Sequence, residues 1–203
     1  RRASSADVLA HLGVAPQQVL RTPAPGSVAY APTALLLPGL ERLLQVRRVL
    51  GLRNSAHSLV KLLDPLAHQG LRSIVVGSYT HPEYAQSMAA TFALTGACAL
   101  LLRGTEGEPV ADPRRTPQMD AFLHGQPQRV QEAQAGPLAA LPSLPTAIDA
   151  AHTAAWIRSV LDGAQPVPAP IAQQVEHILR LAAQMTTEPA HAVHRPPAPP
   201  APH

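Results

Sequence analysis

The chain has 203 residues, a formal net charge of +3, and arginine at 15 of its 16 Lys and Arg positions. This length suffices for one domain with a hydrophobic core, and no apolar run reaches the roughly 18 residues of a membrane-spanning helix. The single cysteine, Cys98, excludes an internal disulfide, and its place in an apolar run predicts a small core residue. Arginine suits bidentate recognition of phosphate, but this composition alone identifies no partner.

The N-terminal part of the chain predicts a short helix, a loop and a strand. Residues 4–12 begin with serines and are closed by Gly13, which is typical of a capped helix. Residues 14–26 are interrupted by three prolines and are expected to form mostly loop. Residues 27–31 are a candidate strand.

Two helices are expected next. The first begins at Pro38 and runs to about Leu50, with Gly51 as its stop signal. The second runs from Ser55 to Leu63 and ends before Pro65, because the residue preceding a proline disfavours the helical conformation.

The middle of the chain alternates between apolar runs and a helix. Residues 72–78 and 97–103 read as buried strands, and residues 81–95 between them read as a helix. This rhythm predicts an α/β fold with a largely parallel sheet flanked by helices. Residues 105–128 are rich in glycine, proline and charge, and predict a loop or a short hairpin.

The C-terminal part predicts helices and a tail. Residues 147–161 and 171–184 are expected to be helical, with a stiff proline-containing linker between them. Residues 187–203 are rich in alanine, proline and histidine, cannot build a core, and predict a disordered tail. We therefore expect one domain over residues 1–186, followed by that tail.

A segment of unbalanced positive charge, residues 42–61, is the most informative part of the chain, and we call it the basic segment. It contains no Asp or Glu, and its five formal cations are Arg42, Arg47, Arg48, Arg53 and Lys61. Residues 53, 57 and 61 (Arg, His and Lys) are four apart, so a continuous helix would align them on one face. The segment is either a solvated helix surface or a patch that binds successive phosphates of a polyanion.

A second charged cluster lies further along the chain. It comprises Glu106, Glu108 and Asp112 beside Arg103, Arg114 and Arg115. Carboxylates suit magnesium, but mixed charges on a loop more often form local ion pairs. We interpret the cluster as local ion pairing and expect no metal site. Trp156 is interpreted as a core residue, and the scarcity of aromatic residues argues against an aromatic-lined single-strand binder.

Three motifs carry a resemblance to a known family. Residues 5–13, SADVLAHLG, resemble the Ser-Ala-Asp-Val-Leu-Glu-Ala-Leu-Gly motif of anthranilate phosphoribosyltransferases. Residues 30–32, YAP, resemble their Phe-Ala-Pro strand, and residues 47–54, RRVLGLRN, resemble their Arg-x-x-Leu-Gly-x-Arg-Thr. The resemblance covers roughly residues 1–110 and implies the C-terminal part of a phosphoribosyltransferase-type α/β domain, in glycosyltransferase family 3. It also implies donor-site or substrate-site positions, here vestigial, at Ser5, Asp7, Arg53, Glu106 and Glu108.

The chain departs from the enzyme pattern at two places. Where the enzymes have Asn and a Gly-Pro turn, this chain has His57 and then Val60-Lys61, which removes the helix breaker. Where the enzymes have an adjacent Asp-Glu pair that helps to hold magnesium, residues 103–110 read RGTEGEPV. We therefore expect no catalytic residue and no cofactor in this chain.

These departures are similar to the YbiB-type branch of the superfamily. That resemblance implies a cytoplasmic homodimer, dimerised through an N-terminal helical region outside this sequence, that binds DNA or RNA with little sequence preference and no membrane. The proposed contacts are Arg47, Arg48, Arg53, His57 and Lys61. The alternative is an active phosphoribosyltransferase that uses magnesium and phosphoribosyl diphosphate and acts on an aromatic amine such as anthranilate.

Overall fold

The computed structural model describes residues 3–52, 54–66, 69–104, 108–138 and 141–187. Its helices are α1 (Ser5–His11), α2 (Thr33–Leu36), α3 (Pro38–Leu50), α4 (Ala56–Leu59), the 3₁₀ helix η1 (Val60–Leu62), α5 (Pro82–Thr95), α6 (Ala150–Leu161) and α7 (Ala169–Thr187). Its strands are β1 (Val75–Tyr79), β2 (Ala99–Arg103), β3 (Met119–Leu123) and β4 (Gln126–Gln131). The α/β fold class is confirmed. The predicted tail from residue 188 onward lies outside the described residues.

The four strands form one sheet in the order β1-β2-β3-β4. The parallel pairing predicted for the first two strands is confirmed, with Val75 opposite Ala99. Strands β3 and β4 are added antiparallel, so the sheet is mixed rather than largely parallel. The short turn at His124 and Gly125, both at positive φ, accounts for the β3–β4 pairing, because so tight a connection joins only antiparallel strands. The predicted loop or hairpin of residues 105–128 is thus partly a hairpin.

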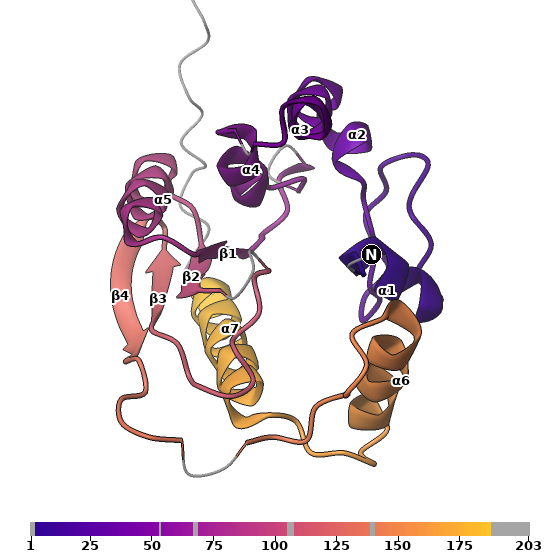
Figure 1. The fold of residues 1–203 in the computed structure, drawn as a ribbon. Coiled ribbons are helices and arrows are strands. Elements are labelled where there is room, and N and C mark those ends of the chain that lie inside the picture. The colour runs from indigo at the N-terminus through magenta and orange to yellow at the C-terminus, as the bar shows by residue number, and fades with distance from the viewer. Residues whose placement is uncertain (1–2, 53, 67–68, 105–107, 139–140, 188–203) are drawn as a thin grey trace, which may run out of the picture.

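Helices cover both faces of the sheet (Figure 1). On one face α5 packs Met88 and Phe92 against the strands, with the rings of Phe92 and Phe122 5.3 Å apart. On the other face α7 contributes Leu181 to a cluster of buried residues that includes Leu100, Leu102 and Met119. Strand β2 is buried on both sides, which explains its continuous apolar run. Cys98 is buried, as expected.

The loop between β2 and β3 is fixed to α7 by side-chain amides. Gln174 accepts from the backbone N–H of Ala111 at 2.8 Å and donates to the carbonyl oxygen of Pro109 at 2.9 Å. Thr116 donates to Gln173 at 2.8 Å. Because Ala111 and Gln174 are both buried, the bond between them satisfies a backbone N–H that water does not reach.

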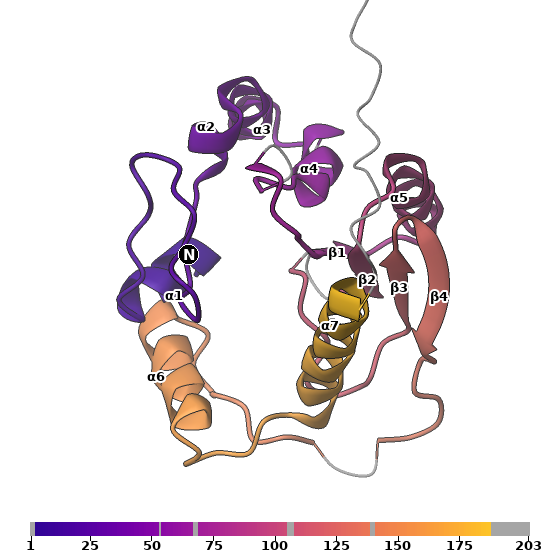
Figure 2. The ribbon, with the colours of Figure 1, turned by 180° about the vertical axis from the view of Figure 1, so that it is seen from behind.

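Helices α1 and α6 pack together although they are far apart in the sequence, and Figures 1 and 2 show them on the side of the molecule away from α5. Helix α1 begins with a capping box, in which Ser4 and Asp7 exchange hydrogen bonds. Asp149 caps α6. Trp156 on α6 is half-buried rather than a core residue, and it donates its indole N–H to the Ser143 carbonyl oxygen at 3.1 Å, which indicates a structural role.

Two local predictions need correction. The strand expected at residues 27–31 is wrong, because this segment contributes only an isolated bridge between Tyr30 and Pro16. A proline has no N–H with which to extend such a ladder. The helix expected from Ser55 to Leu63 forms as two short pieces, α4 and then η1. The helix predicted from Pro38 to Leu50 is confirmed, and Gly51 ends it at a φ of 71°.

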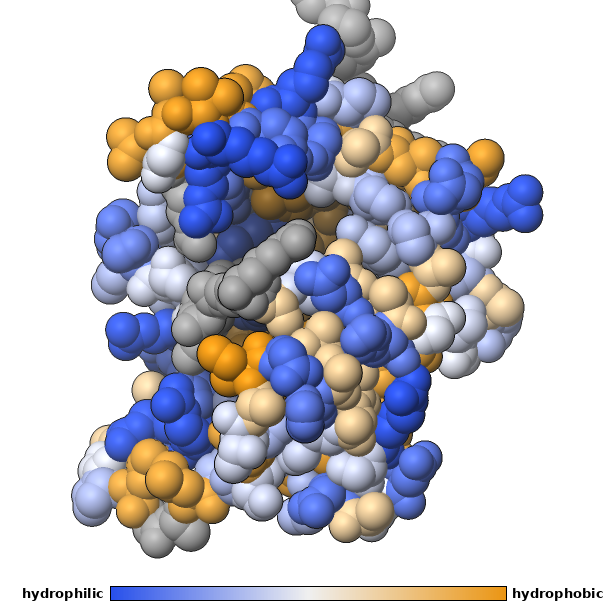
Figure 3. Space-filling model, turned by 45° about the vertical axis from the view of Figure 1, so that its right-hand side comes forward, coloured by the Kyte–Doolittle hydropathy of each residue, from blue (hydrophilic) through white to orange (hydrophobic). Residues whose placement is uncertain are grey.

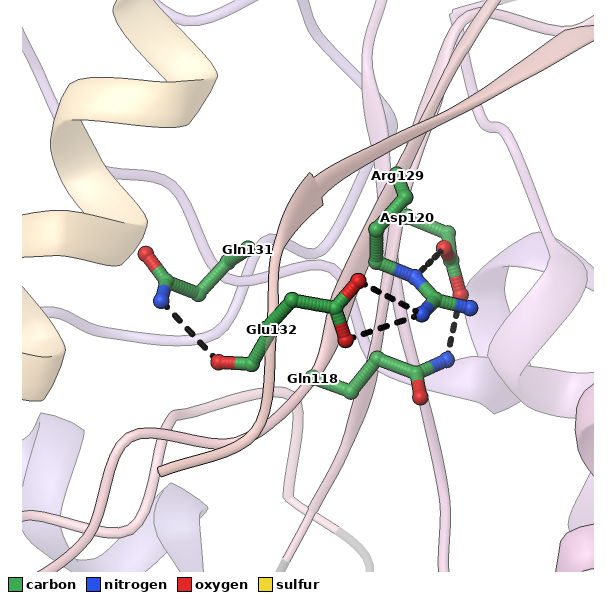
Figure 4. A network of polar contacts seen from close by, with 5 residues as sticks. All are labelled: Gln118, Asp120, Arg129, Gln131 and Glu132. Atoms are coloured by element: carbon green, nitrogen blue, oxygen red, sulfur yellow. Dashed lines mark hydrogen bonds and ion pairs between the residues drawn. The ribbon is translucent and has the colours of Figure 1, made fainter. Parts of the chain in front are cut away.

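A polar network lies at the open end of the β3–β4 hairpin, away from its turn (Figure 4). Asp120 accepts from Arg129 and from Gln118, and Arg129 also pairs with Glu132. Burial raises the pKa of Tyr79, and the negative charge of the Asp120 carboxylate raises it further.

Among the described helices, none combines the length and the apolar character that crossing a membrane requires.

Candidate functional site

Arginines are exposed at the end of α3. Arg47 and Arg48 lie in its last turn, and Arg42 lies one turn after its start. Arg47 and Arg48 form no ion pair with any carboxylate in the described part of the chain, unlike Arg114, Arg129 and Arg180. A cation in the last turn of a helix also interacts favourably with the helix dipole, which is a local role. That role needs no second arginine, so the paired exposure is a candidate for external anion binding.

Apolar side chains are exposed beside these arginines. Leu43, Val49 and Leu50 are each more than half exposed, whereas Leu40 is the buried residue among those described for α3. Figure 3 shows strongly hydrophilic and hydrophobic residues next to one another at the upper end of the molecule, where α3 lies in Figure 1. The exposed charge at this end of α3 is therefore interspersed with apolar area, and the acidic residue of the helix, Glu41, lies in its first turn at the other end.

Asn54 joins α3 to α4 and positions His57. Its side-chain amide donates to the Leu43 carbonyl oxygen at 2.7 Å and accepts from the Ala56 N–H at 3.1 Å. The Nδ1 atom of the half-buried His57 lies 3.2 Å from the Asn54 side-chain oxygen. Because Ala56 is buried, this arrangement fixes the start of α4, and with it the position of the His57 ring.

Lys61 lies in η1 and faces the end of strand β1. Its ammonium donates to the Ser78 carbonyl oxygen at 2.8 Å, with the Ser78 hydroxyl at 3.4 Å. Ser78 is buried and Lys61 is half-buried. The expectation that Lys61 continues a single helical face from His57 is thus only partly met, because the chain changes to a 3₁₀ turn between them. The contact with β1, rather than the helix, sets the direction of Lys61.

His57 and Lys61 nevertheless line one cavity of about 530 Å³ between α4, η1, the end of β1 and α5. Its apolar lining comes from Leu59, Leu62 and Met88. Its hydroxyl groups come from Ser55, Ser58, Ser78, Tyr79, Thr80, Tyr84, Ser87 and Thr91. The described residues that line it include no Asp or Glu. Such a lining suits a partly apolar ligand that carries negative charge.

The structure places the predicted site residues in different regions. Arg53 and Glu106 lie outside the described residues. Ser5 and Asp7 belong to α1, which packs on α6 and is well separated from α4 in Figures 1 and 2. The Asp7 carboxylate accepts from the Ser4 hydroxyl at 2.8 Å as part of the helix cap. Glu108 is exposed.

The acidic loop contains the local ion pairing that the sequence predicts. Asp112 receives two 2.9 Å hydrogen bonds from the Arg114 guanidinium. The side-chain hydrogen bond from Arg114 lowers the pKa of Asp112. Within the described ranges, no three His, Cys, Asp or Glu side chains group as ligands of a metal would.

The residues of β1 and α5 that line the cavity were not predicted from the sequence. Ser78 and Thr80 lie at the carboxyl end of β1, and His81 and Tyr84 lie at the start of α5. A signal for them was present, since the carboxyl end of a parallel strand is a common place for ligand-binding side chains. The run Ser-Tyr-Thr-His directly after the apolar residues of that strand is such a signal.

Comparison with known proteins gives one informative match. No family model matches the chain. The chain is 39% identical over 140 residues to the uncharacterized protein YbiB of Escherichia coli strain K12. The chain is a homologue of YbiB over these residues. The match covers 68% of this chain and 42% of YbiB, so the chain spans about two fifths of the length of this relative. It agrees with the YbiB-type resemblance of the motifs.

Proposed function

We propose that this chain binds DNA or RNA through the sugar-phosphate backbone, with little preference for base sequence. The observation that carries the proposal is the basic segment, in which formal cations occur without any Asp or Glu. The elements that carry its described members are connected by contacts, since α3 packs against α4 and α4 against η1. Several cations within reach of successive phosphates are what polyanion binding requires.

The contacts differ in kind along the segment. Arg47 and Arg48 are exposed, so their guanidinium groups can follow a backbone at the surface. His57 and Lys61 are half-buried, so they contribute from the wall of the cavity. A phosphate beside His57 would favour the protonated ring. We include Arg53 among the contacts on sequence grounds alone.

We infer further that the domain is of the phosphoribosyltransferase type and has lost the transfer reaction. The motif resemblance and the parallel β1–β2 pair support the fold. The replacement of the enzymes' Asp-Glu pair by residues 103–110 supports the loss of activity, because a leaving diphosphate needs bound magnesium.

The test uses fluorescence anisotropy with several short labelled oligonucleotides of unrelated sequence. We expect similar Kd values for all of them, and a Kd that rises steeply with salt concentration, because binding releases counterions. Absence of binding at low salt, or binding that does not respond to salt, would contradict the proposal. Consumption of phosphoribosyl diphosphate with anthranilate and magnesium would establish the enzymatic alternative in its place.

A further inference from the structure

The cavity beside Lys61 has features that backbone binding alone does not use. A surface that only follows phosphates needs exposed cations, whereas this cavity also has apolar lining from Leu59, Leu62 and Met88. Its volume of about 530 Å³ falls in the usual range for sites that enclose small organic molecules.

An aromatic ring stands at the wall formed by α5. Tyr84 is 41% exposed, so one part of its ring remains available to a ligand. His81 contacts it edge to face, with ring centroids 6.2 Å apart and an interplanar angle of 61°. This contact limits the rotation of the Tyr84 ring. A planar, partly oriented ring in a cavity with apolar lining can stack on a flat heterocycle.

Positive charge also lines the cavity, on α4 and η1. The Lys61 ammonium is held there by the Ser78 carbonyl oxygen at 2.8 Å, and His57 lines the same cavity. The hydroxyls of Ser58 and Thr80 also lie among the lining residues and can donate to an anion. The described lining thus combines an aromatic surface, apolar side chains and cationic donors, which match the base, sugar and phosphate of one nucleotide.

We propose that this cavity binds a single unstacked nucleotide, with its base against Tyr84 and its phosphate toward Lys61. The inference rests on the proposed function, and it adds a ligand class to the same region. A base held in a duplex remains stacked and paired and would have to be extruded at a cost. The scarcity of aromatic residues argues against an aromatic-lined groove, but one ring, Tyr84, suffices for one nucleotide. The cavity therefore favours single strands over duplexes, whereas the arginines of α3 bind both.

The test compares a single strand, a duplex and an abasic single strand of equal length, each bound to the wild type and to three variants. Tyr84→Ala removes the stacking surface, Tyr84→Phe retains it, and Tyr30→Ala is a control at a half-buried tyrosine outside the cavity. We expect Tyr84→Ala to weaken single-strand binding roughly fivefold to tenfold, near the lower end of base–aromatic stacking energies. Duplex and abasic binding should not change, and Tyr84→Phe and Tyr30→Ala should behave like the wild type. Equal effects of Tyr84→Ala on all three probes, or no effect on any, would overturn the inference.

Competition with free adenosine monophosphate separates this inference from the proposed function. We expect the nucleotide to displace the single strand and to leave the duplex bound, and we expect inorganic phosphate to do neither. Equal competition by phosphate would overturn the inference, because it would mean a simple anion site. Nucleic-acid binding without any competition would overturn the nucleotide cavity and leave backbone binding standing. If the free nucleotide binds in a manner sensitive to Tyr84→Ala but no nucleic acid binds, the proposed backbone binding is overturned and the nucleotide cavity stands.

Discussion

The Lys61 ammonium donates a 2.8 Å hydrogen bond to the backbone carbonyl oxygen of Ser78, which joins η1 to the end of strand β1. The only lysine of the chain therefore has a structural role, in holding η1 to β1, in addition to its proposed contact with phosphate. This relationship separates the proposed contacts into two groups. Arg47 and Arg48 are exposed, whereas Lys61 is half-buried and held by a backbone group.

Lys61→Met should therefore lower the free energy of unfolding by about 1–2 kcal/mol, because it removes a charged donor from a buried carbonyl group. Urea denaturation measures this change. Lys61→Arg retains a donor and is expected to lose less stability. Arg180→Met is the surface control, and it should cost about 0.5 kcal/mol or less because its ion pair with Glu176 is exposed. Equal stability of Lys61→Met and the wild type would mean that the contact with Ser78 contributes nothing.

Gln174→Ala should release the loop between β2 and β3 from α7. The substitution leaves the Ala111 N–H and the Pro109 carbonyl oxygen without their partner, and Ala111 is buried. We expect a loss of about 2–3 kcal/mol, measured by urea denaturation. Gln86→Ala, at an exposed position in the middle of α5, controls for the change in helix propensity. If both variants unfold at the same urea concentration, the amide bridge has no energetic role.

Gly125→Ala tests the close approach of the β3–β4 turn to α5. A Cβ atom at this position would lie 2.7 Å from the Ala93 carbonyl oxygen, and the residue has a φ of +80°. Gly163 has a similar φ of +75°, but a Cβ there meets nothing within 4 Å. Gly163→Ala therefore reports backbone strain alone, expected at about 1 kcal/mol. We expect Gly125→Ala to cost about 1–3 kcal/mol more in thermal or urea unfolding, from overpacking. Equal costs at the two positions would show that the turn does not press on the helix.

His177 should make the stability depend on pH. Burial, followed by the charge of Arg180, lowers its pKa from 6.5. The unfolded chain then binds more protons than the folded chain between the lowered pKa and about 6.5, so the free energy of unfolding falls as the pH falls through this window. Below the lowered pKa, this contribution no longer changes. Urea denaturation across this pH range measures the effect.

His177→Gln provides the control for that pH dependence. It keeps a side-chain donor for the side-chain amide oxygen of Gln131, which lies 3.4 Å from His177 Nε2, but it cannot titrate. We expect the variant to show a flatter pH dependence than the wild type in this window. Identical slopes in the two proteins would assign the pH dependence to other groups.

The sequence predicts the elements whose signals are local. The helix from Pro38 to Leu50 has a proline at its start and a glycine at its end, and the structure follows both signals. The strands at residues 75–79 and 99–103 contain apolar runs, and such runs can be recognised in the sequence before the pairing strand is known. Residues 27–31 show the limit, since an apolar run forms a strand only where a neighbouring segment can pair with it.

Only one part of the candidate site can be predicted from the sequence, because the other part is assembled by the packing of distant segments. The basic segment is continuous in the sequence, so its charge can be read directly. The wall formed by Ser78, Tyr84 and Thr91 joins it only through the packing of β1 and α5. The contact between Lys61 and Ser78 spans 17 positions of the chain, and no local pattern encodes it.

The salt dependence of nucleic-acid binding tests the central claim most directly. Arg47→Gln/Arg48→Gln should be compared with Arg114→Gln/Arg180→Gln, a double variant that loses the same charge from exposed positions outside the basic segment. If each arginine of α3 neutralises one phosphate, the first variant should lower the slope of log Kd against log salt for a duplex by about 2, and the control should leave it unchanged. Equal slopes for both variants and the wild type would contradict binding through the basic segment.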